Sequence, residues 1–259
     1  MQAAAEKGEF ADARNTDAKA VAVIVGGSRG IGLAMVEDLL SRFKGHVFAT
    51  GRNPQAAAGL QQLMKRHPAR ITPVAMEVTD ETSVAAAASV IRDHSGGRVD
   101  LVVNTAGILH DVNEPSNEGR MPERQLKDVT SDWLLYNFKV NTMGPIFVAK
   151  HLQDMLETKG PRNNGDAARP TSVLATLSAR VGSIEDNRLG GWYSYRISKA
   201  AQNQFTRTAA LELRRRGCIC IALHPGTVQT GLSQPFQVSV EQSKWGRVGW
   251  VETGWLNQW

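Results

Sequence analysis

A tyrosine and a lysine lie four residues apart in the stretch YSYRISKAAQNQF, at Tyr195 and Lys199. Residues four apart share one face of a helix, so a helical stretch would bring the two side chains together. A phenol ordinarily has a pKa of about 10, and a neighbouring ammonium favours the phenolate. The pair could therefore act as a proton donor closer to working pH. The alternative for this spacing alone is a packed tyrosine and a solvated lysine, and Tyr193 is assigned to packing or substrate contact.

A second group of chemically informative residues is rich in glycine. In VIVGGSRGIG, Gly26, Gly30 and Gly32 follow the apolar run 20–25 and precede LAMVEDLLSRF, whose apolar residues have helical spacing. A strand-to-helix turn of this kind directs backbone N–H groups and the positive end of a helix at one spot. The pattern predicts a site for the diphosphate of a dinucleotide, whereas a tight loop without a ligand is the alternative.

Two arginines favour one kind of dinucleotide. Arg29 lies within the glycine-rich turn, and the next strand ends in FATGRNP, with Gly51 and Arg52 where NAD sites usually carry an acid for the ribose 2′-hydroxyl. Guanidinium groups suit a 2′-phosphate. We therefore expect NADP(H) rather than NAD(H), the alternative for each arginine being ordinary surface charge.

Apolar runs that alternate with helix-like segments supply the elements that would position these groups. The expected strands are 20–25, 46–50, 71–76, 99–103, 171–177 and 218–223. The expected helices are about 30–43, 54–67, 80–94, 132–158 and 194–216. Near-continuous apolar strands separated by helices predict a parallel sheet covered on both faces, an α/β doubly wound (Rossmann) single domain. The polar segment 108–131 follows a strand's carboxyl end, where such sheets bind ligands.

The two ends of the chain depart from this pattern. Residues 1–19 are rich in alanine, mixed in charge and without an apolar core, so we expect a disordered leader. We assign residues 20–236 to the nucleotide-binding domain with its catalytic site. Residues 237–259 hold four of the six tryptophans, mostly five residues apart, a spacing that fits neither a helix nor a strand. We expect an atypical tail there and find no convincing last strand.

Composition excludes several classes of protein. Net charge is +5 and the pI is about 9.4, but no basic stripe with interleaved aromatic residues indicates nucleic-acid binding. No apolar run approaches the about 20 residues that a membrane-spanning helix needs. Cys218 and Cys220 lie in an apolar run without a histidine pair, so we expect reduced core thiols and no metal site. We therefore expect a cytoplasmic location, with an organelle also compatible.

Six motifs resemble those of the short-chain dehydrogenase/reductase family, most closely its C-factor-like or carbonyl-reductase-like branch. They are GGSRGIG, NTAG at 104–107, VNTMGP around Asn141, LSARVGS around Ser178, YRISK at 195–199 and HPGTVQT at 224–230. The resemblance covers about residues 20–236, and the motifs occur in the family's order.

The resemblance implies roles for individual residues. The implied catalytic residues are Tyr195 as proton donor, Lys199 as its partner and ribose ligand, Asn141 as support for a relay water, and Ser178 as substrate-orienting hydroxyl. The implied cofactor-binding residues are Gly26, Ser28, Arg29, Gly30, Ile31, Gly32, Arg52, Glu77, Val78, Asn104, Ala106, Gly107, Tyr195, Lys199, Pro225, Gly226, Val228 and Thr230.

The sequence also departs from the family's pattern. Val25 replaces the threonine that often precedes the first motif glycine, so one bracing hydroxyl is missing. Counted from Gly182, the usual serine position holds Ala179, and Ser178 comes one residue earlier. A one-residue offset can turn a side chain to the other face of a strand. Either a bulge presents Ser178, which we favour, or Ser183 or another donor orients the substrate.

These observations predict an NADPH-dependent oxidoreductase that reduces an aldehyde or ketone by hydride transfer, with a tyrosine as proton donor. The serine offset and the missing last strand motivate the alternative, an NADP(H)-binding regulatory protein with little or no turnover. The implied partner is a small-molecule carbonyl substrate, with neither nucleic acid nor membrane. Family members commonly pair through the helices at about 132–158 and 194–216, so the resemblance implies a homodimer or tetramer.

Overall fold

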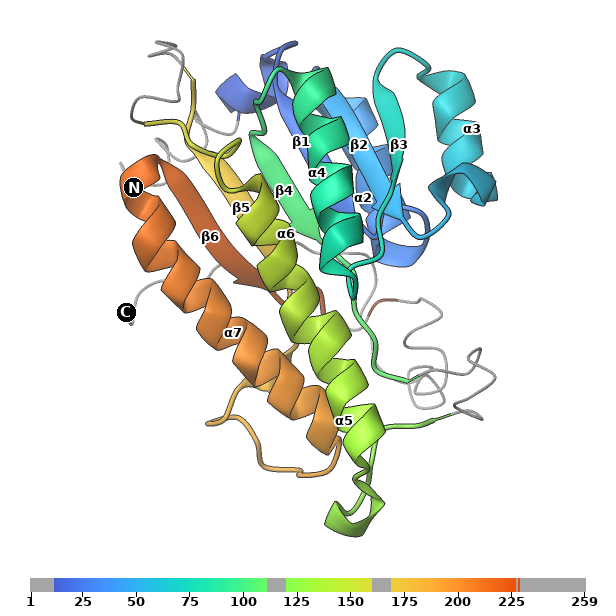
Figure 1. Ribbon diagram of the computed structural model, residues 1–259, viewed down its shortest axis with the longest axis vertical. Coiled ribbons are helices and arrows are strands. Elements are labelled where there is room, and N and C mark those ends of the chain that lie inside the picture. Colours follow the sequence, from blue (N-terminus) through green and yellow to red (C-terminus); the bar gives the residue numbers. More distant parts are fainter. Residues whose placement is uncertain (1–11, 111–119, 160–168, 227, 229–259) are drawn as a thin grey trace, which may run out of the picture.

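A six-stranded parallel sheet forms the centre of the protein in this computed structural model, which describes residues 12–110, 120–159, 169–226 and 228 (Figure 1). The strand order is β3-β2-β1-β4-β5-β6, and every neighbouring pair is parallel. The strands are β1 Val21–Val25, β2 His46–Gly51, β3 Ile71–Ala75, β4 Leu101–Asn104, β5 Ser172–Leu177 and β6 Cys218–Leu223. This is the doubly wound order, which confirms the predicted fold class.

Helices cover both faces of the sheet, with α4, α6 and α7 in front of it in the view of Figure 1. The α-helices are α2 Gly30–Arg42, α3 Ala58–Arg66, α4 Glu81–Ser95, α5 Ser131–Phe138, α6 Gly144–Leu152 and α7 Tyr193–Leu213. A π segment, η4 Lys139–Met143, joins α5 to α6. Short 3₁₀ segments are η1 Pro54–Ala56, η3 Leu126–Asp128, η5 Arg180–Gly182 and η6 Arg214–Arg216.

Two apolar cores lie on the two faces, and β1 contributes to both. Val23 and its alternate neighbours pack with α4, α6 and α7, whereas Ile24 packs with α2 and α3. All five residues of β1 are buried. Successive strand residues point to opposite faces, so an uninterrupted apolar run is what a strand covered on both sides requires.

Two predicted helices are divided in the structure. The segment 54–67 begins as the 3₁₀ helix η1 at Pro54, and Ala57 is extended (φ −75°, ψ 108°) before α3 begins. The segment 132–158 is interrupted by the π segment and its α-helix ends at Leu152. Apolar periodicity did not reveal either interruption, because a local change in backbone hydrogen bonding leaves the spacing of apolar residues nearly intact.

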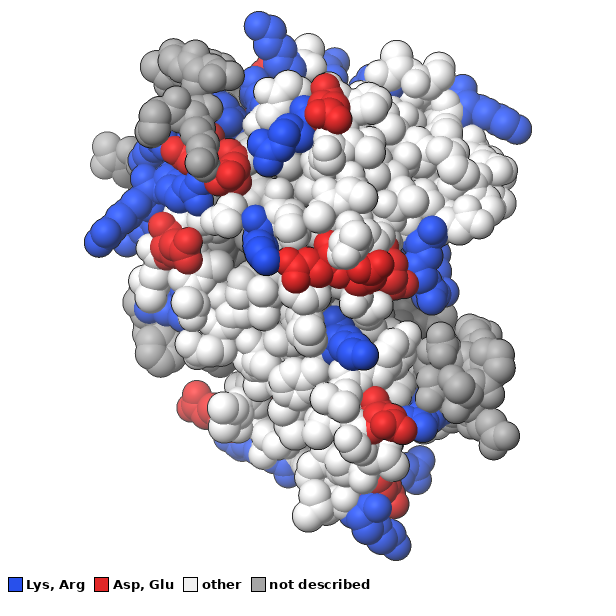
Figure 2. Space-filling view, in the orientation of Figure 1, with Lys and Arg blue, Asp and Glu red and all other residues white. Residues whose placement is uncertain are grey.

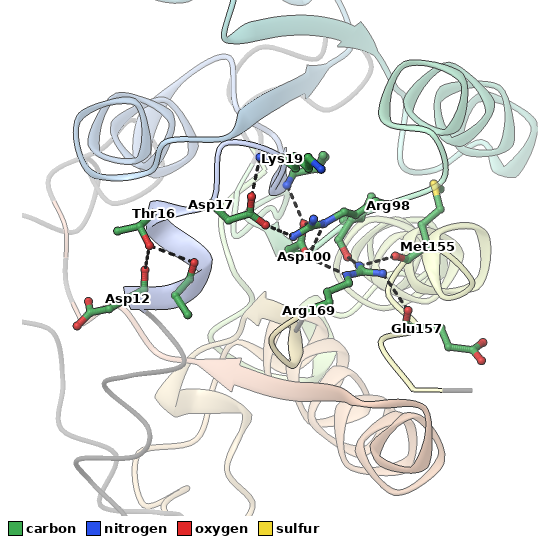
Figure 3. A network of polar contacts seen from close by, with 12 residues as sticks. Asp12, Thr16, Asp17, Lys19, Arg98, Asp100, Met155, Glu157 and Arg169 are labelled. Atoms are coloured by element: carbon green, nitrogen blue, oxygen red, sulfur yellow. Dashed lines mark hydrogen bonds and ion pairs between the residues drawn. The ribbon is translucent and has the colours of Figure 1, made fainter. Parts of the chain in front are cut away.

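A buried carboxylate, Asp100, ties together the amino ends of β1 and β4 (Figure 3). It is 1% exposed and accepts hydrogen bonds from the Val21 N–H (2.8 Å) and from the guanidiniums of Arg98 (2.8 Å) and Arg169 (2.9 Å). Arg98 also pairs with Asp17 at 2.6 Å. Residues 12–19 are thus held against the domain, which the expectation of a disordered leader over 1–19 did not include.

Charged side chains of both signs are interspersed on the face shown in Figure 2. Within the described residues, no helix combines the length and the apolar character needed to cross a bilayer. Cys218 and Cys220 are buried and free. The same part of the chain holds no cluster of three or more His, Cys, Asp or Glu side chains suited to a metal ion. The Trp-rich tail, 237–259, lies outside the described residues.

We predict that Asp100→Ala lowers the free energy of unfolding by about 3–5 kcal/mol, because it leaves Arg98 and Arg169 facing each other without their shared carboxylate. Urea denaturation measures the change. The control is Asp38→Ala, which removes the partner of Arg42 from an exposed pair and should cost no more than about 0.5 kcal/mol. Equal effects of the two substitutions would contradict the central role of Asp100.

Candidate active site

Three elements meet where β1 and β4 end, at the point of the sheet where the strand order reverses. A Cβ atom on Gly107, just after β4, would lie 3.2 Å from Asn141 Oδ1 and 3.5 Å from Lys199 Nζ. Lys199 Nζ in turn lies 5.8 Å from the centroid of the Tyr195 ring. The loop after β4, the π segment and α7 therefore converge at the position where open α/β sheets bind ligands.

Lys199 is held by two acceptors deep in the protein. Its side chain is buried (4% exposed), and Nζ donates to the Leu177 carbonyl and to Gln202 Oε1, each at 2.8 Å. Gln202 Nε2 also donates to the Leu177 carbonyl, at 3.1 Å. The sequence analysis missed Gln202, although its position three residues after Lys199 on a helix placed it on the same face.

Burial dominates the protonation of the tyrosine–lysine pair. It raises the pKa of Tyr195 to about 12 and lowers the pKa of Lys199 to about 7. The sequence led us to expect that Lys199 lowers the pKa of Tyr195. In the chain by itself the pKa of Tyr195 is raised instead, because the phenol is buried and Lys199 Nζ points at Leu177 and Gln202. Tyr195 is thus protonated at neutral pH, the state a proton donor needs.

Asn141 fixes the segment that follows β4. Its Oδ1 accepts from the Ile108 N–H and its Nδ2 donates to the Ile108 carbonyl, both at 2.9 Å. Nδ2 also lies 3.1 Å from Ser198 Oγ on α7. Asn141 lies in the π segment and reaches both the segment after β4 and α7 from there, and such bulges are frequent at functional sites. Its support of a relay water stays a prediction.

Ser178 lies directly after β5, but its hydroxyl is already engaged. Oγ donates to Asn203 Oδ1 at 2.6 Å, and Asn203 Nδ2 donates to the Gly182 carbonyl at 3.3 Å. A serine has one proton to donate, so this arrangement leaves Ser178 only as an acceptor toward a substrate. Ser183 Oγ accepts a hydrogen bond from the Asp186 N–H at 3.2 Å. This bond does not use the hydroxyl proton of Ser183. The assignment of the orienting hydroxyl stays a prediction.

The glycine-rich turn after β1 is too tight for side chains. Gly26 has a left-handed φ of +80°, and a Cβ on Gly32 would lie 2.1 Å from the Gly26 carbonyl oxygen. Thr105 Oγ1 and the Thr105 N–H both donate to the Val25 carbonyl, at 2.7 and 2.9 Å. The hydroxyl that Val25 lacks is therefore replaced by one from the neighbouring strand's end.

The corner beside this turn carries the two arginines. A Cβ on Gly51 would lie 2.8 Å from Ser28 Oγ, so the residues that follow, Arg29 and Arg52, start from adjoining segments. Arg29 occupies the N-cap position of α2 without a side-chain capping hydrogen bond. The Arg52 side chain is 65% exposed, with Nε 4.0 Å from Glu77 Oε2. Guanidiniums that start from adjoining segments are chemically suited to a 2′-phosphate, and this role of Arg29 and Arg52 stays a prediction.

The structure places most of the other predicted cofactor-binding residues near the carboxyl ends of the strands, and their contacts with a dinucleotide stay predictions. Glu77 Oε1 accepts from the N–H and hydroxyl of Thr79, and Asn104 Oδ1 accepts from the Ala106 N–H at 3.0 Å. Asn104 Nδ2 is buried without a partner among the described residues. Ile31 and Val78 lie in α2 and after β3, Pro225, Gly226 and Val228 follow β6, and Thr230 lies outside the described residues. The unpaired Asn104 Nδ2 could donate to a bound nucleotide, because a buried donor needs an acceptor.

Comparisons with known proteins agree with this geometry. The sequence model described as short chain dehydrogenase matches residues 20–240. The chain therefore belongs to the short-chain dehydrogenase/reductase family, whose members are oxidoreductases. It is 31% identical over 210 residues to an uncharacterized oxidoreductase of Schizosaccharomyces pombe, covering 81% of this chain and 74% of that one.

Two further relatives bear on the branch of the family. C-signal of Myxococcus xanthus is 32% identical over 139 residues, which are 54% of this chain and 71% of that protein. The crystal structure of an NADPH-bound carbonyl reductase from chicken fatty liver is 32% identical, with a TM-score of 0.70 over 82% of this chain and 77% of that one. These similarities confirm the C-factor-like and carbonyl-reductase-like resemblance.

The buried ammonium predicts a specific pH dependence of stability. The pKa of Lys199 is about 7 in the folded chain and about 10.5 when unfolded. Between these values only the unfolded chain binds the proton, so stability rises with pH. We expect the free energy of unfolding of the wild type to rise relative to Lys199→Met by about 1 kcal/mol per pH unit above pH 7. Urea denaturation from pH 6 to 10 measures it, and a constant difference would contradict the burial of a titrating amine.

Proposed function

We propose that the protein is an NADPH-dependent reductase of small aldehydes or ketones. The observation that carries this proposal is the buried pair Tyr195 and Lys199, which lies beside Gly107 and Asn141 at the carboxyl end of the sheet. A protonated phenol next to a nucleotide crevice is suited to carbonyl reduction. Membership of an oxidoreductase family and similarity to a carbonyl reductase support the same activity.

Each residue of the site would have a separate role in the reduction. NADPH, when bound, supplies a hydride to the carbonyl carbon. Tyr195 Oη gives its proton to the carbonyl oxygen, on which negative charge develops. Lys199 stabilises the phenolate left behind, because its ammonium offsets the cost of a buried anion. Gln202 and the Leu177 carbonyl hold that ammonium in place.

The turn after β1 would hold the diphosphate of the cofactor, since its glycines let the backbone N–H groups and the α2 N-terminus approach closely. Arg29 and Arg52 would hold the 2′-phosphate. Glu77 and Val78 would lie at the adenine end, while Asn104, Ala106 and Gly107 would close the crevice along its middle. A cytoplasmic location and a homodimer or tetramer belong to the same proposal.

Tyr195→Phe is the decisive test. Removing the hydroxyl should lower kcat with NADPH and a panel of aldehydes, ketones and quinones by about 100- to 10,000-fold, the usual contribution of a positioned proton donor. The dissociation constant for NADPH should change less than about threefold, since the phosphate turn is untouched. Tyr136→Phe, which alters a tyrosine on α5, is the control. Full turnover of Tyr195→Phe would refute the proposed chemistry.

Arg52→Ala tests the cofactor. Loss of one guanidinium from the ribose corner should raise the KM for NADPH about tenfold or more, a loss of about 1.4 kcal/mol or more, typical of one charge-assisted contact. The KM for NADH should stay within about twofold, because NADH has no 2′-phosphate. Initial rates at varied NADPH and at varied NADH, followed by the fluorescence of the reduced nicotinamide, give the two KM values. An equal loss for the two cofactors would contradict this role of Arg52.

One observation favours a second function, an NADP(H)-binding regulator with little turnover. The hydroxyl of Ser178 is committed to Asn203, and Ala179 occupies the family's usual serine position. If Ser183 does not take over the role of orienting hydroxyl, the site would bind the nucleotide but reduce carbonyls poorly. NADPH binding without consumption across the carbonyl panel would support the regulator, and clear consumption with any member would reject it.

A further inference from the structure

The amino end of α7, the helix that carries the tyrosine–lysine pair, has no cap of its own. Trp192 precedes the helix and makes no side-chain cap hydrogen bond, and the first turn contains no acidic residue. The first N–H groups of a helix have no partner within it, and unpaired ones in a buried place are costly. Another part of the chain must therefore satisfy the first turn of α7.

Glu123 supplies acceptors for the first turn of α7, although it lies 71 residues before Ser194 in the sequence. Its carboxylate Oε2 accepts from the Ser194 N–H at 3.2 Å, and Oε1 accepts from the Ser194 hydroxyl. The Glu123 carbonyl accepts from the Trp192 N–H at 2.5 Å. The side chain is 4% exposed, so a negative charge is buried at the positive end of a helix, where the helix dipole stabilises it.

The connection into α7 is strained, and its neighbours hold it in that form. Gly190, Gly191 and Trp192 have φ of +64°, +65° and +54°, and Trp192 is the one non-glycine residue with positive φ in the described part of the chain. Arg196 Nε donates to the Gly191 carbonyl at 2.9 Å and Nη2 to the Gly190 carbonyl at 3.1 Å. Such conformations persist only where surrounding contacts over-determine them, and they cluster at functional sites.

The first turn of α7 also contains the proposed proton donor. Tyr195 is the third residue of the helix, directly after Ser194. The Trp192 ring meets the Tyr195 ring edge-on, with centroids 6.3 Å apart and planes at 69°. A first turn that frays or shifts would therefore displace both rings, and a displacement of about 1 Å can cost a reaction about 100-fold.

We propose that Glu123 is a positioning residue that caps α7 from the segment after β4 and thereby fixes Tyr195 for proton transfer. The inference rests on the proposed function. Glu123 belongs to the polar segment that follows β4 on the ligand side of the sheet, so it also joins this segment to the helix that carries the pair. Its carboxylate touches neither reacting group and acts through Ser194 and the backbone of Trp192.

Glu123→Ala and Glu123→Gln test this role with NADPH and the carbonyl panel. We expect kcat per NADPH-binding site to fall about 30-fold for Glu123→Ala and about threefold to tenfold for Glu123→Gln, which keeps one acceptor. The dissociation constant for NADPH and the KM for the carbonyl should stay within about threefold. Counting sites by NADPH binding removes any effect of misfolded protein. Glu185→Gln, which changes an exposed carboxylate in the connection before α7, should resemble the wild type.

A double-substitution cycle and hydrogen exchange add independent readouts. Glu123→Ala combined with Ser194→Ala should lose less than the product of the two separate losses, because both remove the same contact. Amides of residues 192–196 should exchange at least tenfold faster in Glu123→Ala than in Glu185→Gln. Unchanged kcat per site in both Glu123 variants overturns the positioning role even when Tyr195→Phe is inactive. If the wild type reduces no carbonyl, the proposed function fails and the positioning role fails with it, whereas exchange at 192–196 still shows whether Glu123 caps the helix.

Discussion

The burial of one ammonium group is the constraint on which the rest of the site depends. Lys199 Nζ is removed from water and must find acceptors inside the protein, because buried N–H donors without partners are costly whether or not the group is charged. It finds them at the end of β5, in the Leu177 carbonyl, and one turn farther along α7, in Gln202. These hydrogen bonds fix α7 against the carboxyl end of β5, next to the loops that follow β4 and β5.

Close approach of the surrounding backbone is what makes this burial feasible. A Cβ on Gly182 would lie 2.9 Å from Lys199 Cβ, and one on Gly107 would reach 3.2 Å from Asn141 Oδ1. Glycine at both positions lets the loops after β5 and β4 close on α7 from two sides. The same property serves the glycine-rich turn after β1, where Gly32 packs against the Gly26 carbonyl. The absence of a side chain at these glycines therefore determines how closely the loops and α7 approach one another.

Two amides and one carboxylate hold the residues of the candidate site in place. Gln202 holds Lys199, Asn203 holds the Ser178 hydroxyl, and Glu123 holds the turn that precedes Tyr195. The first two are consecutive on α7, so a single stretch of helix determines the direction of an ammonium and of a hydroxyl. The hydrogen bond from Ser178 to Asn203 is also the observation behind the non-enzymatic alternative, because it leaves Ser178 no proton to donate to a substrate.

The sequence by itself determined the sheet, the glycine-rich turn after β1 and the tyrosine–lysine pair. Strands buried on both faces need continuous apolar runs, a turn without room for Cβ atoms needs glycine, and a pair on one helix face needs a fixed spacing; all three are local properties that a sequence records. The break at Ala57 and the π segment around Asn141 changed backbone hydrogen bonds without changing apolar spacing, so periodicity could not reveal them.

Only the tertiary structure decided which distant groups meet. Thr105 replaces the hydroxyl that Val25 lacks, Asp17 and Asp100 share Arg98, and Glu123 caps a helix that begins 70 residues later. It also showed that burial, rather than the neighbouring ammonium, sets the pKa of Tyr195 in the chain by itself. Contacts and burial of this kind arise from the packing of segments far apart along the chain, and no spacing within a single segment encodes them.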